Sequence, residues 1–253
     1  MPEKKNHITE VIENIEVAVG VWHITVKAPE LAEAALPGQF VQVLVEGAGL
    51  LLRRPLGIAG VNVEQGTVEL FYRILGKGTN KLTEYRIGDS LSLLGPLGHG
   101  FDTSAGRVLI VGGGMGLAPV KFLAERLDHC EVLLGGRNAA ELFWTKFYEP
   151  VTGAMHITTD DGSVGTKGFT VALLPELLAT GRFDRVAACG PEIMMKKTFE
   201  ICREQGVPCE VSLERRMACG LGACLSCNID STDGRRLHVC QDGPVFLGEE
   251  VFP

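Results

Sequence analysis

Short runs of alternating hydrophobic and polar residues fill the first hundred positions of the chain. Between residues 9 and 26, β-branched side chains fall mostly on alternate positions, which is the period of a half-buried strand. Further runs of this kind follow, separated by turns rich in glycine and proline: residues 40–45, 68–74 and 90–94. We therefore predict a small antiparallel β-barrel over residues 1–102, with one helical turn at residues 80–85.

The pattern changes after residue 102, where short apolar strands alternate with helical stretches. Strands are predicted at residues 107–111, 131–134, 155–158, 185–188 and 207–212, and helices at residues 120–127, 140–147, 169–178 and 193–204. Repeated strand–helix units predict a parallel sheet covered on both faces, with ligands at the carboxyl ends of its strands. The predicted fold class is thus a β-barrel followed by an α/β domain over residues 103–212.

The last part of the chain, residues 213–253, carries a cysteine pattern. Cys219, Cys224 and Cys227 follow the spacing C-x4-C-x2-C, and Cys240 comes after twelve further residues. This is the plant-type spacing for a [2Fe–2S] cluster. The glycines between the first two cysteines allow a tight loop whose N–H groups point at the cluster sulfurs. About forty residues are too few for a separate ferredoxin fold, so we expect this segment to pack on the α/β domain.

Glycine loops at the strand ends of the α/β domain indicate a nucleotide site. Strand, glycine loop and helix bring backbone amides onto a dinucleotide pyrophosphate, and the loop here holds Gly112, Gly113, Gly114 and Gly116. The spacing is not G-x-G-x-x-G, and Gly135, Gly136 and Arg137 stand where an acid would contact a ribose. Cys189, Gly190 and Pro191 end a later strand, and we predict that they lie near a nicotinamide; a helix N-terminus that carries a buried cysteine is the alternative.

Two stretches of the barrel are candidates for phosphate binding. Arg53 and Arg54 stand beside Pro55, and two arginines at a proline-fixed turn can hold a diphosphate bidentately. A solvated basic turn is the alternative. Residues 76–79, Gly-Lys-Gly-Thr, would open a short helix and offer free N–H groups to phosphate.

Composition and charge narrow the classes of function. The chain has 253 residues, of which 45% are hydrophobic, and a formal net charge of −7, which argues against nucleic acid as a main partner. No apolar run is long enough to span a bilayer, and residues 1–7 lack the apolar core of a signal peptide. We therefore expect a cytoplasmic protein, in which the eight cysteines serve metal binding and packing, not disulfides. No hydrolytic or zinc-protease motif is recognised.

Taken in order, these motifs resemble the ferredoxin–NADP reductase superfamily, and within it the electron-transfer subunit of type B dihydroorotate dehydrogenase. The matching stretches extend from residue 37 to residue 246: residues 37–40, 52–56, 71–73, 95–98, 112–116, 159–162, 189–191, 212–219 and 239–246. The cysteine segment is the most specific of them.

The resemblance implies three cofactor or substrate sites and no catalytic residue in this chain. FAD would be held by Arg54, Pro55, Leu56, Gly57, Phe71, Tyr72, Arg73, Gly78 and Thr79. NAD(H) would be held by Gly112, Gly113, Gly114, Gly116, Asp161, Cys189, Gly190 and Pro191, and the [2Fe–2S] cluster by Cys219, Cys224, Cys227 and Cys240. One departure is Gly57, where the superfamily often has a serine whose hydroxyl bonds flavin N5.

The resemblance also implies a partner. An FMN-containing catalytic subunit would oxidise dihydroorotate in pyrimidine (UMP) biosynthesis, and electrons would pass through the cluster and FAD to NAD+, in a heterotetramer with two of each chain. One alternative is the small subunit of an NAD(P)H–ferredoxin oxidoreductase, of the sulfide-dehydrogenase or bifurcating-transhydrogenase type, in which Arg137 would favour a 2′-phosphate. Another is a regulatory protein that binds zinc, although zinc sites usually show two C-x2-C-type pairs.

Overall fold

A computed structural model describes residues 4–47 and 49–253. Residues 1–3, which begin the predicted barrel and the N-terminal stretch considered above, lie outside this range, as does residue 48. The barrel elements are β1 (Lys5–Ala18), β2 (Val21–Lys27), α1 (Pro29–Ala34), β3 (Phe40–Leu44), β4 (Arg54–Asn62), β5 (Thr67–Arg73), α2 (Lys77–Leu82) and β6 (Ser90–Leu97). They are followed by β7 (Val108–Gly113), η1 (Gly114–Gly116), α3 (Leu117–Arg126), β8 (Cys130–Gly136), η2 (Ala139–Trp144), α4 (Thr145–Tyr148), β9 (Ala154–Thr159), β10 (Thr166–Lys167), η3 (Thr170–Leu173), α5 (Leu174–Ala179), β11 (Arg185–Cys189), α6 (Glu192–Gln205) and β12 (Cys209–Ser212). The chain ends with β13 (Asn228–Asp230), β14 (Arg236–His238), β15 (Val245–Leu247) and α7 (Gly248–Val251).

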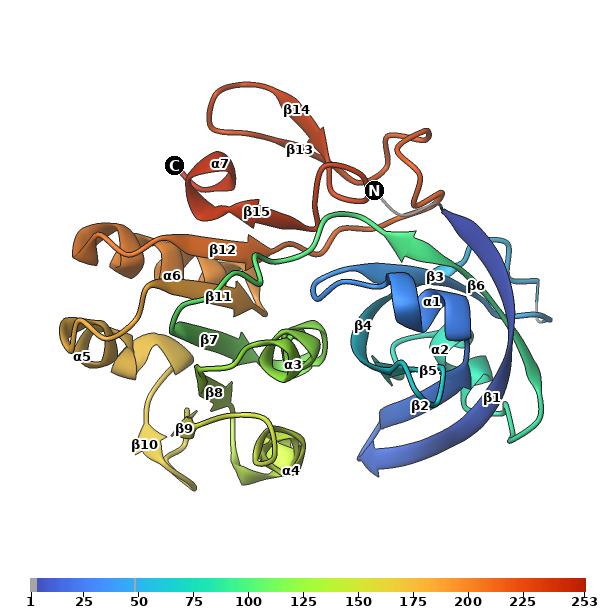
Figure 1. Cartoon of the computed structure of the whole chain (residues 1–253), viewed down its shortest axis with the longest axis horizontal. Coiled ribbons are helices and arrows are strands. Elements are labelled where there is room, and N and C mark those ends of the chain that lie inside the picture. Colours follow the sequence, from blue (N-terminus) through green and yellow to red (C-terminus); the bar gives the residue numbers. More distant parts are fainter. Residues whose placement is uncertain (1–3, 48) are drawn as a thin grey trace.

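The first strands close into an antiparallel barrel in the order β1-β2-β5-β4-β3-β6 (Figure 1). Alternation along β3 follows the predicted period: Val41 and Val43 enter the barrel core, whereas Phe40 packs with the core of the α/β part. The predicted antiparallel barrel is therefore confirmed, and one strand of it faces two different cores.

One local prediction in the barrel was wrong, and another was shifted along the chain. The stretch around Arg54 and Pro55 is not a turn but the start of strand β4, in which Pro55 lies opposite Gln42 of β3. Proline is tolerated near the first residue of a strand because few ladder bonds are lost there. The short helix spans Lys77–Leu82 in place of residues 80–85, and it opens at residues 76–79 as predicted, with Gly76 as its extended N-cap.

The second half forms a twisted sheet in the order β10-β9-β8-β7-β11-β12-β15, parallel except for β15. Strand β7 shows why both faces are covered: Leu109 and Val111 pack with α5 and α6, and Val108 and Ile110 pack with α3 and α4. The predicted parallel α/β architecture is confirmed. The second and third of its four predicted helices each divide into a 3-10 turn and a short helix: Leu142 leaves the helical region, and Pro175 stands in the first turn of α5.

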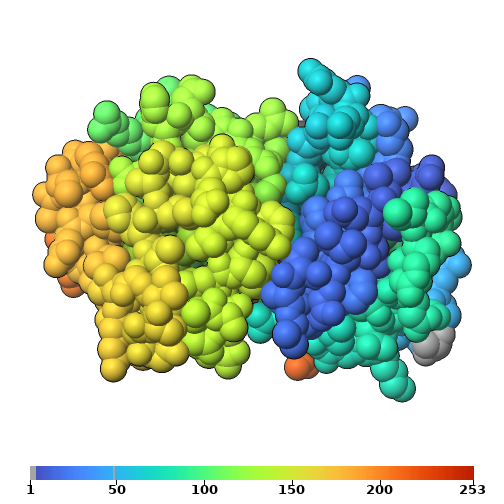
Figure 2. Space-filling model, turned by 90° about the horizontal axis from the view of Figure 1, so that it is seen from below, coloured from blue at the N-terminus to red at the C-terminus, as the bar shows by residue number. Residues whose placement is uncertain are grey.

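The cysteine segment lies across the junction of the two parts (Figure 1). Strand β15 pairs antiparallel with β12, so the segment returns to the α/β sheet. On its other side, the N–H of His99 donates to the Gly243 carbonyl at 2.6 Å. From the perpendicular direction, barrel and α/β part form two lobes in broad contact (Figure 2). Among the described residues, no helix has the length and apolarity needed to cross a bilayer.

Candidate functional site

A cavity of about 340 Å3 lies where barrel, α/β part and cysteine segment meet. Most of the residues predicted to hold FAD line it: Arg54, Pro55, Leu56, Gly57, Phe71, Tyr72, Arg73 and Thr79. The α/β part contributes Met115, Ala118, Pro119, Cys189 and Ser212, and the C-terminal part contributes Leu213, Glu214, Arg215, Met217 and Pro244. We refer to this space as the barrel cavity.

The end of the barrel cavity formed by Arg54 and α2 is suited to phosphate. The Arg54 guanidinium lies directly against Gly78, so closely that a Cβ at position 78 would overlap it. The hydroxyl of Thr79 accepts hydrogen bonds from the N–H groups of Leu75 at 2.9 Å and Gly76 at 3.3 Å. Gly78 thus acts by admitting the arginine, and a cation and a helix start converge on one place.

Only one of the two neighbouring arginines faces this place. The Arg53 guanidinium instead donates to the carbonyl oxygens of Gln42 and Ser92, both at 3.1 Å, and to Asn6 Oδ1 at 2.9 Å. Adjacent side chains of a strand point to opposite faces. The idea that both arginines clamp one diphosphate is therefore wrong, and Arg53 joins strands of the barrel.

The glycine at position 57 is explained by its neighbour. A Cβ there would lie 3.1 Å from Cβ of Pro119, at the start of helix α3. A serine would press on that proline, so glycine allows the α/β part to close against β4. Nearby, the buried Tyr72 hydroxyl donates to Asn14 Oδ1 at 2.9 Å, and burial raises the pKa of Tyr72.

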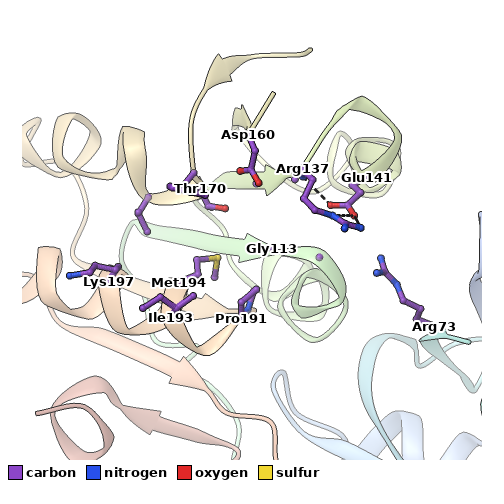
Figure 3. A pocket seen from close by; sticks show the side chains of 15 residues that line it. Arg73, Gly113, Arg137, Glu141, Asp160, Thr170, Pro191, Ile193, Met194 and Lys197 are labelled. Atoms are coloured by element: carbon purple, nitrogen blue, oxygen red, sulfur yellow. Dashed lines mark hydrogen bonds and ion pairs between the residues drawn. The ribbon is translucent and has the colours of Figure 1, made fainter. Parts of the chain in front are cut away.

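A second cavity, of about 530 Å3, lies at the carboxyl ends of the parallel strands (Figure 3). Its lining is Arg73, Gly113, Gly114, Gly135, Gly136, Arg137, Glu141, Asp160, Phe169, Thr170, Val171, Pro191, Ile193, Met194 and Lys197. We refer to it as the sheet-end cavity. Arg73 reaches it from the barrel and also lines the barrel cavity, so one side chain borders both spaces.

The residues predicted to hold NAD(H) divide between the two cavities. Gly113, Gly114 and Pro191 line the sheet-end cavity, and Cys189 lines the barrel cavity. Burial raises the pKa of the Cys189 thiol, so it stays protonated. Gly112, Gly116 and Gly190 lie behind these surfaces. A Cβ at Gly116 would be 2.5 Å from Cys189 backbone atoms, which brings the two loops together.

Asp161 lies differently from the prediction. Its Oδ1 accepts a hydrogen bond from the N–H of Ser163 at 2.9 Å, which holds the loop, and the neighbouring Asp160 lines the cavity instead. Arg137 forms a pair with Glu141: its Nε donates to Oε1 at 2.7 Å and its backbone N–H donates to Oε2 at 2.9 Å. This pairing lowers the pKa of Glu141. It also engages the guanidinium of Arg137, which the sequence analysis considered as a ligand of a 2′-phosphate.

Sequence reasoning missed Glu214. It lines the barrel cavity, where loss of contact with water raises the pKa of its carboxyl, although the residue as a whole is exposed. The available signal was its place inside residues 212–219, between the end of β12 and Cys219.

Sequence reasoning also missed the ionic contact between the lobes. Buried Lys121 of α3 places Nζ 3.3 Å from Glu69 Oε2 of β5, and Glu69 also faces His23 Nε2 at 3.4 Å. The hydrogen bond from His23, with Lys121 adding charge, lowers the pKa of Glu69 to about 2.

The four cysteines of the C-terminal segment lie together as two pairs. The hydrogen bond from Ser226, with Cys219 contributing, lowers the pKa of Cys224 to about 6. Burial, followed by the nearby thiol of Cys227, raises the pKa of Cys240 to about 12. Two pairs of neighbouring thiols, Cys219 with Cys224 and Cys227 with Cys240, match two irons with two thiolates each.

Backbone N–H groups of the loop are directed at the sulfurs, as expected for an anionic cluster. Leu221 N–H donates to Cys219 Sγ at 3.3 Å, and Gly222 N–H donates to Cys240 Sγ at 3.2 Å. Cys227 and Cys240 are 2% and 1% exposed, whereas Cys224 is exposed. The donor set therefore fits a [2Fe–2S] cluster with one side toward the protein and one toward the outside.

Comparisons with known proteins agree with this geometry. Residues 9–101 match the family model of the oxidoreductase FAD-binding domain. Residues 214–252 match the iron–sulfur cluster binding domain of dihydroorotate dehydrogenase B, which favours iron over zinc. The chain is 36% identical over 255 residues to the dihydroorotate dehydrogenase B (NAD(+)) electron transfer subunit of Clostridium acetobutylicum, covering 99% of this chain and 98% of that protein. It is 38% identical over 245 residues to the subunit of the same name from Desulforamulus reducens, covering 93% and 94%.

A solved structure is also similar over nearly the whole chain. It comes from the NADH-dependent reduced ferredoxin–NADP oxidoreductase, described for flavin-based electron bifurcation. The TM-score is 0.85 at 33% identity, and the match covers 97% of this chain and 90% of that one. A ferredoxin NADP+ reductase from Neisseria gonorrhoeae, at 19% identity and a TM-score of 0.61 over 81% of this chain and 93% of that one, shares the fold.

Proposed function

The chain belongs to the family of electron-transfer subunits of dihydroorotate dehydrogenase B, and we propose that it carries electrons from a catalytic partner to NAD+. The partner is an FMN-containing subunit that oxidises dihydroorotate to orotate, in the pyrimidine (UMP) pathway of the cytoplasm. We further propose an assembly with two copies of each chain, and a division of this chain at residues 102 and 212.

FAD and a [2Fe–2S] cluster supply the redox chemistry, because a flavin exchanges two electrons as hydride or one at a time, and the cluster takes one at a time. Arg54 binds the FAD diphosphate beside Gly78 and Thr79, and Gly57 offers only its backbone N–H to the flavin. Cys219, Cys224, Cys227 and Cys240 bind the cluster. The glycines of residues 112–116 and Pro191 bind NAD(H) in the sheet-end cavity.

The proposal rests on one observation: all three parts of the chain line the same cavity. The barrel cavity is lined by Gly57 of the barrel, by Cys189 of the α/β part, and by Met217, two residues before Cys219. Arg73 borders both this cavity and the sheet-end cavity. This proximity supports a series arrangement of nicotinamide, flavin and cluster.

The partner would cover the exposed side of the cysteine loop. Cys224 is exposed there, and the apolar side chains of Leu221 and Leu225 are 41% and 56% exposed. Apolar side chains at the surface around a redox centre are suited to a protein interface that excludes water. Docking at this loop would bring the partner's FMN near the cluster.

The test is anaerobic purification of the tagged chain with whatever protein accompanies it. We expect a brown-yellow complex with an FMN-containing subunit that forms orotate from dihydroorotate when NAD+ is added. A colourless protein with stoichiometric zinc, or a partner without FMN and without orotate formation, would refute the proposal.

A second candidate function has one specific observation in its favour. The solved structure from the NADH-dependent reduced ferredoxin–NADP oxidoreductase matches 97% of the chain, so this chain can also be imagined as the small subunit of such an enzyme. Co-purification with a large ferredoxin-dependent flavoprotein would favour that candidate. The Arg137–Glu141 pair argues that the chain itself would still use NAD(H) and not NADP(H).

A further inference from the structure

Gln42, in the middle of strand β3, carries a buried amide that lacks partners. The residue is 0% exposed, and within the described part of the chain neither Nε2 nor Oε1 has a hydrogen-bond partner. Leaving a buried polar group unsatisfied costs about 1–3 kcal/mol, and buried side-chain amides normally make hydrogen bonds. Such an amide indicates a group that joins it in the functional protein.

The side chain of Gln42 faces the cysteine loop. Its neighbours Val41 and Val43 enter the barrel core, so the period of the strand places Gln42 on the outer face. There it meets Gly220, the residue after Cys219: a Cβ at position 220 would lie 2.8 Å from both Cγ and Nε2 of Gln42. The amide nitrogen is therefore next to the turn that carries the first ligand of the cluster.

The backbone of Gln42 pairs with strand β4, which lines the barrel cavity. Gln42 lies opposite Pro55 of β4, which lines the barrel cavity beside Arg54. Gln42 thus contacts β4 through its main chain and the cysteine loop through its side chain. Water from outside does not reach this place, because the side chain is fully buried.

We propose that Gln42 Nε2 donates a hydrogen bond to sulfur of the iron–sulfur site, either Cys219 Sγ or a sulfide of the cluster, and thereby raises its reduction potential. This inference rests on the proposed function. Anionic sulfur is a strong acceptor, and a donor stabilises the more negative, reduced state. The same loop already directs N–H groups of Leu221 and Gly222 at cysteine sulfurs, and the Gln42 amide would add a donor from the barrel side.

The test compares Gln42→Met, which keeps the length of the side chain and removes both polar groups, with a matched control. Gln39 is 2% exposed, but its amide is satisfied: Nε2 donates to the Gly98 carbonyl and Oε1 accepts from Leu36 N–H, both at 2.8 Å. The full chain is purified anaerobically with FAD and cluster, and its cluster potential is measured by a titration followed by electron paramagnetic resonance. Thermal unfolding is measured for the cluster-loaded and the cluster-free chain.

We expect Gln42→Met to lower the cluster potential by up to 59 mV, the tenfold shift of a one-electron equilibrium, with the FAD potential unchanged. It should raise the melting temperature of the cluster-free chain, where the amide is orphaned, and not that of the loaded chain. Gln39→Met should lower the melting temperature in both states and leave the potential unchanged. Gln42→Leu, which also removes both polar groups, should lower the potential in the same way and keeps the test available if Gln42→Met folds poorly.

An unchanged cluster potential in Gln42→Met and Gln42→Leu would overturn the inference. So would an equal change of melting temperature in the loaded and cluster-free forms, which would mean that a trapped water or the backbone satisfies the amide. These outcomes differ from failure of the proposed function, in which the unsubstituted chain itself would bind no cluster.

Discussion

The contact between Arg54 and Gly78 predicts that replacing Gly78 by alanine affects protein stability and FAD affinity in opposite directions. A Cβ at position 78 would overlap the Arg54 guanidinium, so Gly78→Ala must move the arginine away from the start of α2. At the same time, alanine is a better helix former than glycine, by at most about 1 kcal/mol at Gly78, which is the second residue of α2. We therefore expect this variant to keep or gain stability as the flavin-free protein and to lose affinity for FAD.

The size of the loss follows from the displaced contact. A hydrogen bond to a charged group contributes about 1.5–3 kcal/mol, and 1.4 kcal/mol corresponds to a factor of ten in the dissociation constant. Gly78→Ala should therefore weaken FAD binding roughly 10- to 150-fold. The assay is removal of the flavin, titration with FAD followed by fluorescence, and a melting curve of the flavin-free chain.

The matched control is Gly76→Ala, two residues earlier. A Cβ there meets nothing within 4 Å, and its φ of −171° is open to any residue, so FAD binding should stay the same. A double substitution tests the cause: if Gly78→Ala acts through Arg54, it adds little in the Arg54→Ala background. Full additivity of the two changes, or unaltered FAD affinity in Gly78→Ala, would refute the assignment of the diphosphate to this end of the barrel cavity.

Three further results are expected. Cys224→Ser should remove the iron–sulfur absorption and leave FAD content and NADH-to-dye activity nearly intact; an equal loss of both activities would contradict the series arrangement. Gly116→Ala places a Cβ 2.5 Å from backbone atoms of Cys189, so the KM for NADH should rise at least tenfold with FAD content unchanged; wild-type kinetics would show that the two loops need not touch. The pKa of Glu69 falls from 4.5 to about 2 through its bond with His23, so its contribution to stability is present above pH 4.5 and is lost between pH 4.5 and 2. The melting temperature of Glu69→Gln should accordingly fall less over that interval than that of the unsubstituted chain, and parallel curves would speak against this contact.

Local patterns were enough to predict the two large parts of the fold. Alternation along β3 and β7 reflects the side-chain period of a strand, and that period is a property of neighbouring residues. The strand that carries Arg54 was mistaken for a turn for the same reason. Its proline is a local signal of a turn, and its pairing with Gln42 is a contact between segments that no local pattern records.

For the candidate site, the sequence predicted the cluster ligands but not all of the residues that line the cavities. Cysteine spacing identified the cluster ligands because all four sulfurs belong to one short segment. Asp160 and Asp161 are adjacent in a loop, and which of them lines the cavity depends on the bond from Ser163 N–H to Asp161. Glu214 carries no motif of its own, and its importance comes from its place in the lining of the barrel cavity, to which both lobes contribute.

The position of the cysteine loop depends most of all on long-range pairing. Residues 213–253 leave the sheet after β12 and return to it as β15, antiparallel to the strand they left. Both ends of the segment are thus fixed at one edge of the α/β sheet, so the loop between them must project toward the barrel. There Gly220 lies against Gln42 of β3, and β4, the strand that lines the barrel cavity, pairs with β3. The distance between flavin and cluster is therefore set by an antiparallel strand at the far end of the chain. A variant that weakens β15 should lower the rate of electron transfer between the two centres before it affects either cofactor's binding.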